Sequence, residues 1–222
     1  MHPQPAQDKR SETALKILAA ARDLFSERGF DGTTVDEIAQ RAGVNKATLY
    51  YQIGDKQTLY AGVILDVMGS AAETTARDLM DEQSPEEKIR TYIRNVAAAM
   101  DRNPWMPPIM LREMASGGRN FPETVILGLA RIFSILGAII KEGVRRGTFV
   151  DASPILVHLM IVGVFVFFKT SAPLRERQAW PTLDWTTGED RVSGAMAAEV
   201  ERLVLRALKK TPGDGGQEER SL

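Results

Sequence analysis

Two short helices joined by a tight turn are predicted between residues 33 and 56, and this stretch constrains the chain more than any other. Thr34 can cap the first helix, because a threonine followed three residues later by Glu37 forms a capping box. Gly43 stands where that helix must end and the chain must turn, since glycine takes the left-handed conformation without steric cost. Asn45 can cap the second helix. The spacing therefore predicts a pair of packed helices.

The outward face of the second helix carries side chains that suit contact with DNA. A lysine can reach a base edge or a phosphate, hydroxyls and an amide can donate to phosphate oxygens, and a small alanine lets the helix approach the groove floor. From Ala42 to Gly54 the sequence has no acidic residue. We therefore expect a helix-turn-helix that enters the major groove, although an ordinary helical hairpin with a polar face would show the same spacing. The candidate DNA contacts are Thr34, Asn45, Lys46, Ala47, Thr48, Tyr50, Tyr51, Gln52 and Lys56.

An ordered pattern runs from about Ala14 to Leu59. It reads Ala21-x-x-Leu24-Phe25, Gly29-Phe30-x-x-Thr33-Thr34-Val35-x-x-Ile38-Ala39, Ala42-Gly43-Val44-x-Lys46-x-Thr48-Leu49-Tyr50-Tyr51 and Gly54-x-Lys56-x-x-Leu59. The segment resembles the DNA-binding domain of the TetR family of one-component transcriptional regulators. The chain departs from the usual family pattern at Gln52 and Ile53, where histidine and phenylalanine are common. Gln52 can still donate to a phosphate, and Ile53 keeps an apolar anchor.

Charge and composition narrow the class of protein. The chain has 222 residues and a net charge of −1, and residues 1–60 hold eight Lys/Arg and eight Asp/Glu, so a basic footprint must come from arrangement on one face. There is no cysteine, which excludes disulfides and thiolate chemistry. The N-terminus has no apolar core of a signal peptide, and the most apolar run, residues 155–168, is too short to span a membrane. We expect a cytoplasmic protein with no membrane partner.

Helical periodicity recurs along the whole chain and no strand pattern stands out, so the predicted fold class is all-α with about nine helices. Asp55, Ser84 and Ser153 can cap long helices, and Glu87 would complete a capping box with Ser84. The expected helices cover residues 11–28, the two short helices above, and residues 56–80, 84–100, 103–116, 122–146, 153–168 and 193–209. Prolines are expected to break the first half of the segment 103–116, and residues 171–190, with Trp180 and Trp185, to form a loosely structured connection.

Two folded parts are expected. The predicted divisions are a disordered arm at residues 1–10, a three-helix helix-turn-helix DNA-binding domain at 11–58, a helical bundle for ligand binding and dimerisation at 59–210, and a disordered tail at 211–222. The ligand and dimer roles of the second part are what the TetR resemblance implies. The helix that starts near residue 56 would link the two parts and carry a conformational change between them.

Few residues of the chain are candidates for catalysis or for binding a metal or cofactor. The histidines are His2, in the arm, and His158, on an apolar helix, so no catalytic triad, metal site or cofactor site is predicted, and no enzyme activity is expected. Arg112 and Glu113 would pair with each other or with a ligand. A cluster of flexible and aromatic side chains predicts an apolar ligand pocket, although each of these residues taken singly fits ordinary core better. The candidate pocket residues are Trp105, Met106, Met110, Met114, Phe133, His158 and Phe165.

The resemblance implies a sequence-specific DNA-binding regulator, most often a repressor. Its partners would be a double-stranded, near-palindromic operator, a second copy of the chain, and an apolar or amphipathic small molecule that releases the DNA. The helices 153–170 and 193–209 would pair with their copies in the homodimer. The alternative is a helical small-molecule carrier or enzyme whose N-terminal domain serves protein contact.

Overall fold

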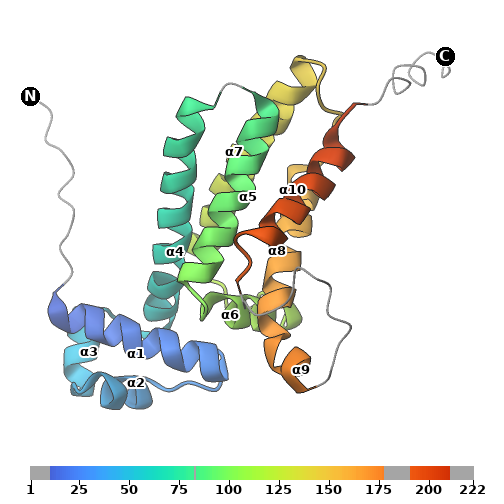
Figure 1. Ribbon diagram of the computed structural model, residues 1–222. Helices are drawn as coiled ribbons and strands as arrows, with labels where there is room; N and C mark the ends of the chain where they lie inside the picture. The colour runs from blue at the N-terminus through green and yellow to red at the C-terminus, as the bar shows by residue number, and fades with distance from the viewer. Residues whose placement is uncertain (1–10, 83, 178–190, 211–222) are drawn as a thin grey trace, which may run out of the picture.

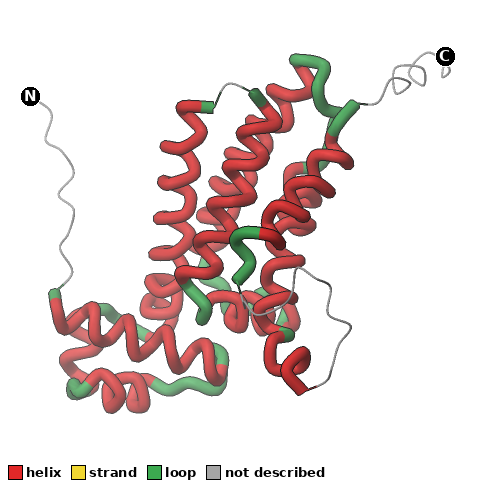
Figure 2. Tube along the Cα trace, in the orientation of Figure 1, coloured by secondary structure: helices red, strands yellow, loops and turns green. Residues whose placement is uncertain are grey.

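The computed structural model describes residues 11–82, 84–177 and 191–210, and within these ranges the chain is helical (Figures 1 and 2). Three helices come first: α1 (Glu12–Arg28), α2 (Val35–Ala42) and α3 (Lys46–Gln52). The helices that follow are α4 (Lys56–Asp78), α5 (Pro85–Arg102), α6 (Met106–Ala115), α7 (Glu123–Arg145), α8 (Pro154–Thr170), α9 (Ala172–Arg177) and α10 (Ala195–Leu208), with a 3-10 turn η1 (Leu79–Asp81) after α4. The all-α class is confirmed, and the described helices exceed the expected nine by one.

The short helices α1–α3 lie together at one end of the molecule, and the long helices form an upright bundle beside them (Figure 1). α6 lies across the lower end of the bundle, next to α1. Side chains from α1, α2 and α3 meet in one core with the start of α4, where the rings of Phe25 and Tyr60 pack edge to face with centroids 4.8 Å apart. α4 runs without a break across the predicted boundary between residues 58 and 59.

Side-chain caps fix where the long helices begin. Asp55, Ser84 and Ser153 each accept a hydrogen bond from a backbone amide in the first turn of the helix that follows, as predicted. The capping box at Ser84 does not close, because the carboxylate of Glu87 turns to the guanidinium of Arg90. Local sequence therefore places these helix starts, whereas competition among side chains decides the finer contacts.

Two sequence expectations about irregular segments were wrong. Pro107 and Pro108 lie in the first turn of α6, where a missing amide hydrogen costs nothing, so they open the helix instead of breaking it. The start of the segment 171–190, expected to be a loose connection, contains the helix α9, and Ser171 alone separates α9 from α8. Trp180, Trp185, the arm 1–10 and the tail 211–222 lie outside the described residues.

The bundle has a core of its own, formed by α5, α7, α8 and α10. Within the described residues α7 is the one helix long and apolar enough to cross a membrane by length and composition alone, with a mean hydropathy of 1.9. In this fold one face of α7 packs against α4, α5 and α8, and 28% of its apolar window is buried.

A close approach between Gly143 and Phe149 joins α7 to the end of α10. The buried ring of Phe149 covers Gly143, and the backbone beside it pairs with α10 through Val150 N–H to Leu208 O at 2.8 Å and Lys210 N–H to Thr148 O at 3.1 Å. A Cβ atom added at Gly143 would lie 2.0 Å from Cδ2 of Phe149. Glycine is therefore required here for packing.

Gly143→Ala is expected to lower the free energy of unfolding by about 1–3 kcal/mol, because the methyl group must displace a buried ring. The matched control is Gly69→Ala on α4, where an added Cβ meets no atom within 4 Å. That change should stabilise the protein by about 0.5–1 kcal/mol, the usual gain of alanine over glycine inside a helix. Urea unfolding measures both, and a Gly143→Ala protein as stable as the Gly69→Ala protein would contradict the packing argument.

Candidate nucleic-acid interface and internal cavity

The turn between α2 and α3 is built by the predicted residues. Thr34 Oγ1 accepts from Glu37 N–H at 3.3 Å, and the Glu37 carboxylate accepts from Thr34 N–H at 2.9 Å, which completes the capping box. Gly43 ends α2 with φ 69° and ψ 30°, in the left-handed region. Asn45 Oδ1 accepts from Thr48 N–H at 2.7 Å and begins α3. The predicted helix-turn-helix geometry is confirmed.

Contacts from the start of α1 and from the loop after it hold the end of α3 and the start of α4. Ser11 Oγ donates to Gln52 Oε1 at 2.6 Å, so the start of α1 meets the end of α3. Lys56 Nζ lies 4.1 Å from the centroid of the Phe30 ring, a cation–π contact. Gln52 and Lys56 are therefore oriented by the protein before any nucleic acid arrives.

The face of α3 that points away from the core carries the remaining candidates. Ala47, Tyr50 and Tyr51 are exposed, Tyr51 at 87%, and Thr48 is half-buried. Lys46 Nζ is not free: it lies 3.0 Å from Asp36 Oδ2 on α2, and this hydrogen bond raises the pKa of Lys46. Sequence reasoning missed Asp36, because its approach to Lys46 depends on how α2 and α3 cross. An exposed pair of this kind contributes little to stability, because water screens it.

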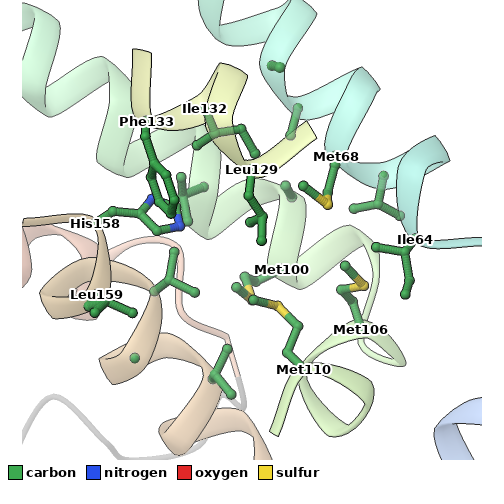
Figure 3. A pocket seen from close by; sticks show the side chains of 18 of the residues that line it. Ile64, Met68, Met100, Met106, Met110, Leu129, Ile132, Phe133, His158 and Leu159 are labelled. Atoms are coloured by element: carbon green, nitrogen blue, oxygen red, sulfur yellow. The ribbon is translucent and has the colours of Figure 1, made fainter. Parts of the chain in front are cut away.

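A cavity of about 350 Å³ lies inside the bundle, enclosed by α4, α5, α6, α7 and α8 (Figure 3). Its volume is within the range of small-molecule sites. In Figure 3, His158 and Phe133 lie at one end, Ile64 and Met68 at the other, and Met110 between them. The lining is apolar apart from Thr75, Tyr92 and His158. The shape and chemistry suit an apolar molecule.

Most of the candidate pocket residues line this cavity. Met106, Met110, Met114, Phe133 and His158 do so.

Trp105 and Phe165 do not line it. The Trp105 ring instead faces α1, with the Arg22 guanidinium 5.8 Å from its centroid, and Phe165 is fully buried in the core of the bundle. Helical periodicity explains why Phe165 does not line the cavity. The residues of α8 that do line it repeat every four positions, at 158, 162 and 166 and at 159, 163 and 167, and Phe165 belongs to neither row.

Several lining residues were not predicted. α4 contributes Ile64, Val67, Met68, Ala71, Ala72 and Thr75, and α5 contributes Tyr92, Val96, Ala99 and Met100. Helical periodicity does place an inner face on both helices, but the same pattern is expected for a packed core. Nothing in that pattern distinguishes a side chain that faces a neighbour from one that faces a cavity.

His158 is held at the cavity wall by Tyr92. The Tyr92 hydroxyl and His158 Nδ1 are 2.6 Å apart, and the Phe133 ring packs edge to face with the imidazole at a centroid distance of 5.1 Å. Burial lowers the pKa of His158 from 6.5 to about 4 and raises the pKa of Tyr92. Both side chains are therefore neutral at pH 7.

Arg112 and Glu113 connect the cavity wall to the DNA-binding helices. The Arg112 guanidinium donates to the backbone carbonyls of Ser26 and Glu27 in the last turn of α1, at 2.9 Å for Glu27. The buried Glu113 carboxylate accepts from the Tyr60 hydroxyl of α4 at 2.9 Å. Arg112 and Glu113 thus contact different elements and do not pair with each other, because consecutive residues on a helix point in different directions.

The free energy of unfolding is expected to fall between pH 7 and about pH 4.5 by about 2 kcal/mol more in the wild type than in His158→Gln. The folded-state pKa of His158 is about 4, below its ordinary 6.5, so the unfolded chain takes up the proton first as the pH falls. Denaturant titrations of both proteins at each pH measure the difference. Equal pH dependence in the two proteins would mean that His158 is not a buried neutral group.

Comparison with known proteins shows what the chain is similar to. Residues 17–63 match the model of the bacterial regulatory proteins of the tetR family. The chain is 27% identical over 197 residues to the HTH-type transcriptional regulator RutR of Escherichia coli, covering 87% of this chain and 89% of RutR. It is 26% identical over 183 residues to the HTH-type transcriptional repressor NicS of Pseudomonas putida, covering 77% of this chain and 85% of NicS.

Solved structures agree in fold. The regulator FadR of Bacillus subtilis, crystallised with stearoyl-CoA, superposes with a TM-score of 0.69 at 20% identity, over 87% of this chain and 98% of FadR. The TetR-family regulator PfmR of Thermus thermophilus gives a TM-score of 0.62 at 25% identity, over 87% of this chain and 99% of PfmR. With its helix-turn-helix at residues 34–52 inside the matching segment, and with relatives aligned along most of its length, the chain is similar to the TetR family of bacterial transcriptional regulators.

Proposed function

We propose that the protein is a dimeric transcriptional repressor that leaves its operator when an apolar small molecule fills the cavity. The observation that carries this proposal is the position of α6. Met106, Met110 and Met114 on this helix line the cavity, while Arg112 and Glu113 on the same helix hold α1 and α4. A molecule in the cavity therefore contacts the helix that positions the DNA-binding end.

In the DNA complex α3 enters the major groove. Lys46, at its start, leaves Asp36 for a base edge or a close phosphate, and separating the two costs little because the pair is exposed to solvent. Tyr51, Gln52 and Lys56 hold the phosphate backbone, and the amide groups at the start of α3 favour negative charge. Because DNA lies in the bacterial cytoplasm, the protein acts there. None of its residues is assigned a catalytic role.

The dimer forms through α8 and α10. Large apolar side chains on α8 stay exposed in one chain, as does Leu203 on α10. An apolar face of this kind marks an interface. The exposed set on α8 is Ile155, Leu156, Leu159, Met160, Val164 and Phe167. Two copies joined here present two α3 helices to the halves of a near-palindromic operator.

The names of relatives support this reading. NicS is named a repressor, and FadR was solved with a small-molecule ligand, stearoyl-CoA.

The free energy that a ligand must supply to release the operator is modest. A ligand that binds the DNA-free arrangement about 1.4 kcal/mol more tightly than the DNA-bound arrangement weakens operator affinity tenfold. A gel shift with the DNA upstream of the protein's own gene tests operator binding, and no shift at low salt would refute it.

Lys46→Ala is expected to weaken binding to that operator by about 1–3 kcal/mol and to relax base preference at one position in each half-site. Lys56→Ala should instead weaken all sequences about equally and lower the slope of log affinity against log salt by about one unit. Arg77→Ala, an exposed change near the end of α4, is the control and should leave affinity unchanged. Unchanged affinity in a folded Lys46→Ala protein would remove Lys46 from the interface.

Leu203→Glu is expected to give monomers that lose operator binding, because the charge must be buried without a partner when α10 meets its copy. Leu127→Glu on α7 is the matched control: Leu127 is 63% exposed, lies outside α8 and α10, and its substitution should leave the dimer intact. Sedimentation at micromolar concentration distinguishes the two. A monomeric wild type, or a Leu203→Glu protein that still sediments as a dimer, would overturn the assignment of the interface.

A further inference from the structure

The cavity has one polar end and no charged residue in its lining. The polar residues of the lining are Thr75, Tyr92 and His158, and the others are aliphatic, aromatic and methionine side chains. Among the described residues that line the cavity there is no aspartate, glutamate, lysine or arginine. An ionised group placed there would lose its hydration without gaining an opposite charge, at a cost of several kcal/mol. The lining therefore selects against carboxylates and amines.

The contact with Tyr92 fixes the tautomer of His158. The imidazole is neutral, so one ring nitrogen carries a hydrogen and the other accepts. The buried Tyr92 hydroxyl, 2.6 Å from Nδ1, has no other hydrogen-bond partner among the described residues, and a phenol donates to an imidazole lone pair more strongly than it accepts. The Tyr92 hydroxyl thus donates to Nδ1, and the hydrogen of the ring lies on Nε2.

The Nε2–H group faces open space in the cavity. In the described part of the chain every fully buried side-chain nitrogen or oxygen has a hydrogen-bond partner, and His158 is bonded only through Nδ1. Nε2 is therefore accessible, and since the residue as a whole is 6% exposed and lines the cavity, the accessible part lies on the cavity side. Figure 3 shows the ring extending from α8 beside Phe133. A donor held in this way is unsatisfied once water leaves the cavity.

We propose that the cavity binds an uncharged, mostly apolar molecule that accepts one hydrogen bond from His158 Nε2 through an oxygen such as a ketone or ester carbonyl. This inference rests on the proposed function, in which the cavity is the effector site. His158 is the specificity-determining residue, and Tyr92 is a positioning residue that keeps the hydrogen on Nε2. The apolar body of the ligand lies among Met68, Met110 and Leu129.

Three probes of one size test the proposal with the full-length protein. Valerophenone carries a carbonyl, pentylbenzene replaces that carbonyl by a methylene group, and ω-phenylvalerate carries a carboxylate. Melting temperature and calorimetric titration report binding. For the wild type we expect valerophenone to bind about tenfold more tightly than pentylbenzene, which leaves Nε2–H unpaired, and ω-phenylvalerate to bind most weakly.

Two variants locate the hydrogen bond. The double change His158→Leu with Tyr92→Phe removes both polar partners together, so that no buried hydroxyl is left unpaired, and the ketone should lose its advantage. His158→Gln places an amide N–H near the position of Nε2 and lets the amide oxygen accept from Tyr92, so the ketone should keep most of its advantage. Met110→Trp fills the cavity and should abolish binding of all three probes.

The outcomes separate the two proposals. If valerophenone and pentylbenzene bind the wild type equally, or if the double variant still prefers the ketone, the role of His158 is refuted while the effector cavity stands. Tightest binding by ω-phenylvalerate would refute the exclusion of charge. If no probe binds, or if Met110→Trp binds as the wild type does, the cavity is not the effector site and the inference fails with it.

Discussion

The junction between α6 and the DNA-binding helices is the contact on which the rest of the structure depends. Arg112 satisfies carbonyl groups that α1 would otherwise leave unpaired at its end, and the buried Glu113 carboxylate accepts from Tyr60 of α4. α1 in turn packs against α2 and α3, and Ser11 before it donates to Gln52 at the end of α3. The orientation of α3 is therefore set by a ten-residue helix whose other face lines the cavity.

Much of the fold could be predicted because its signals are local. The caps at Thr34, Asn45, Asp55 and Ser153 each join a side chain to an amide three residues away, and such contacts are readable from spacing alone. The left-handed turn at Gly43 is likewise a property of one residue. The helix-turn-helix was therefore predicted nearly to the residue, together with the all-α class.

The cavity was predicted less well because it depends on contacts between distant helices. An apolar stripe marks an inward face, yet it does not say which neighbour fills the space opposite, so Trp105 and Phe165 were assigned wrongly and the contribution of α4 and α5 was missed. Tyr60, which donates to Glu113, and the α1 carbonyls that accept from Arg112 lie more than fifty residues away along the chain. Adjacent charges in a sequence suggest a pair, whereas a helix directs them to different elements.

The balance of charge in the DNA-binding end has a consequence for how the protein distributes along a chromosome. Eight basic and eight acidic residues in the first sixty, with Asp36 beside Lys46, leave little net positive field to attract phosphates of arbitrary sequence. Non-specific affinity comes almost entirely from such attraction, and a genome offers millions of competing sites. A nearly neutral domain therefore spends less time on bulk DNA, so that few copies of the protein suffice to keep one operator occupied.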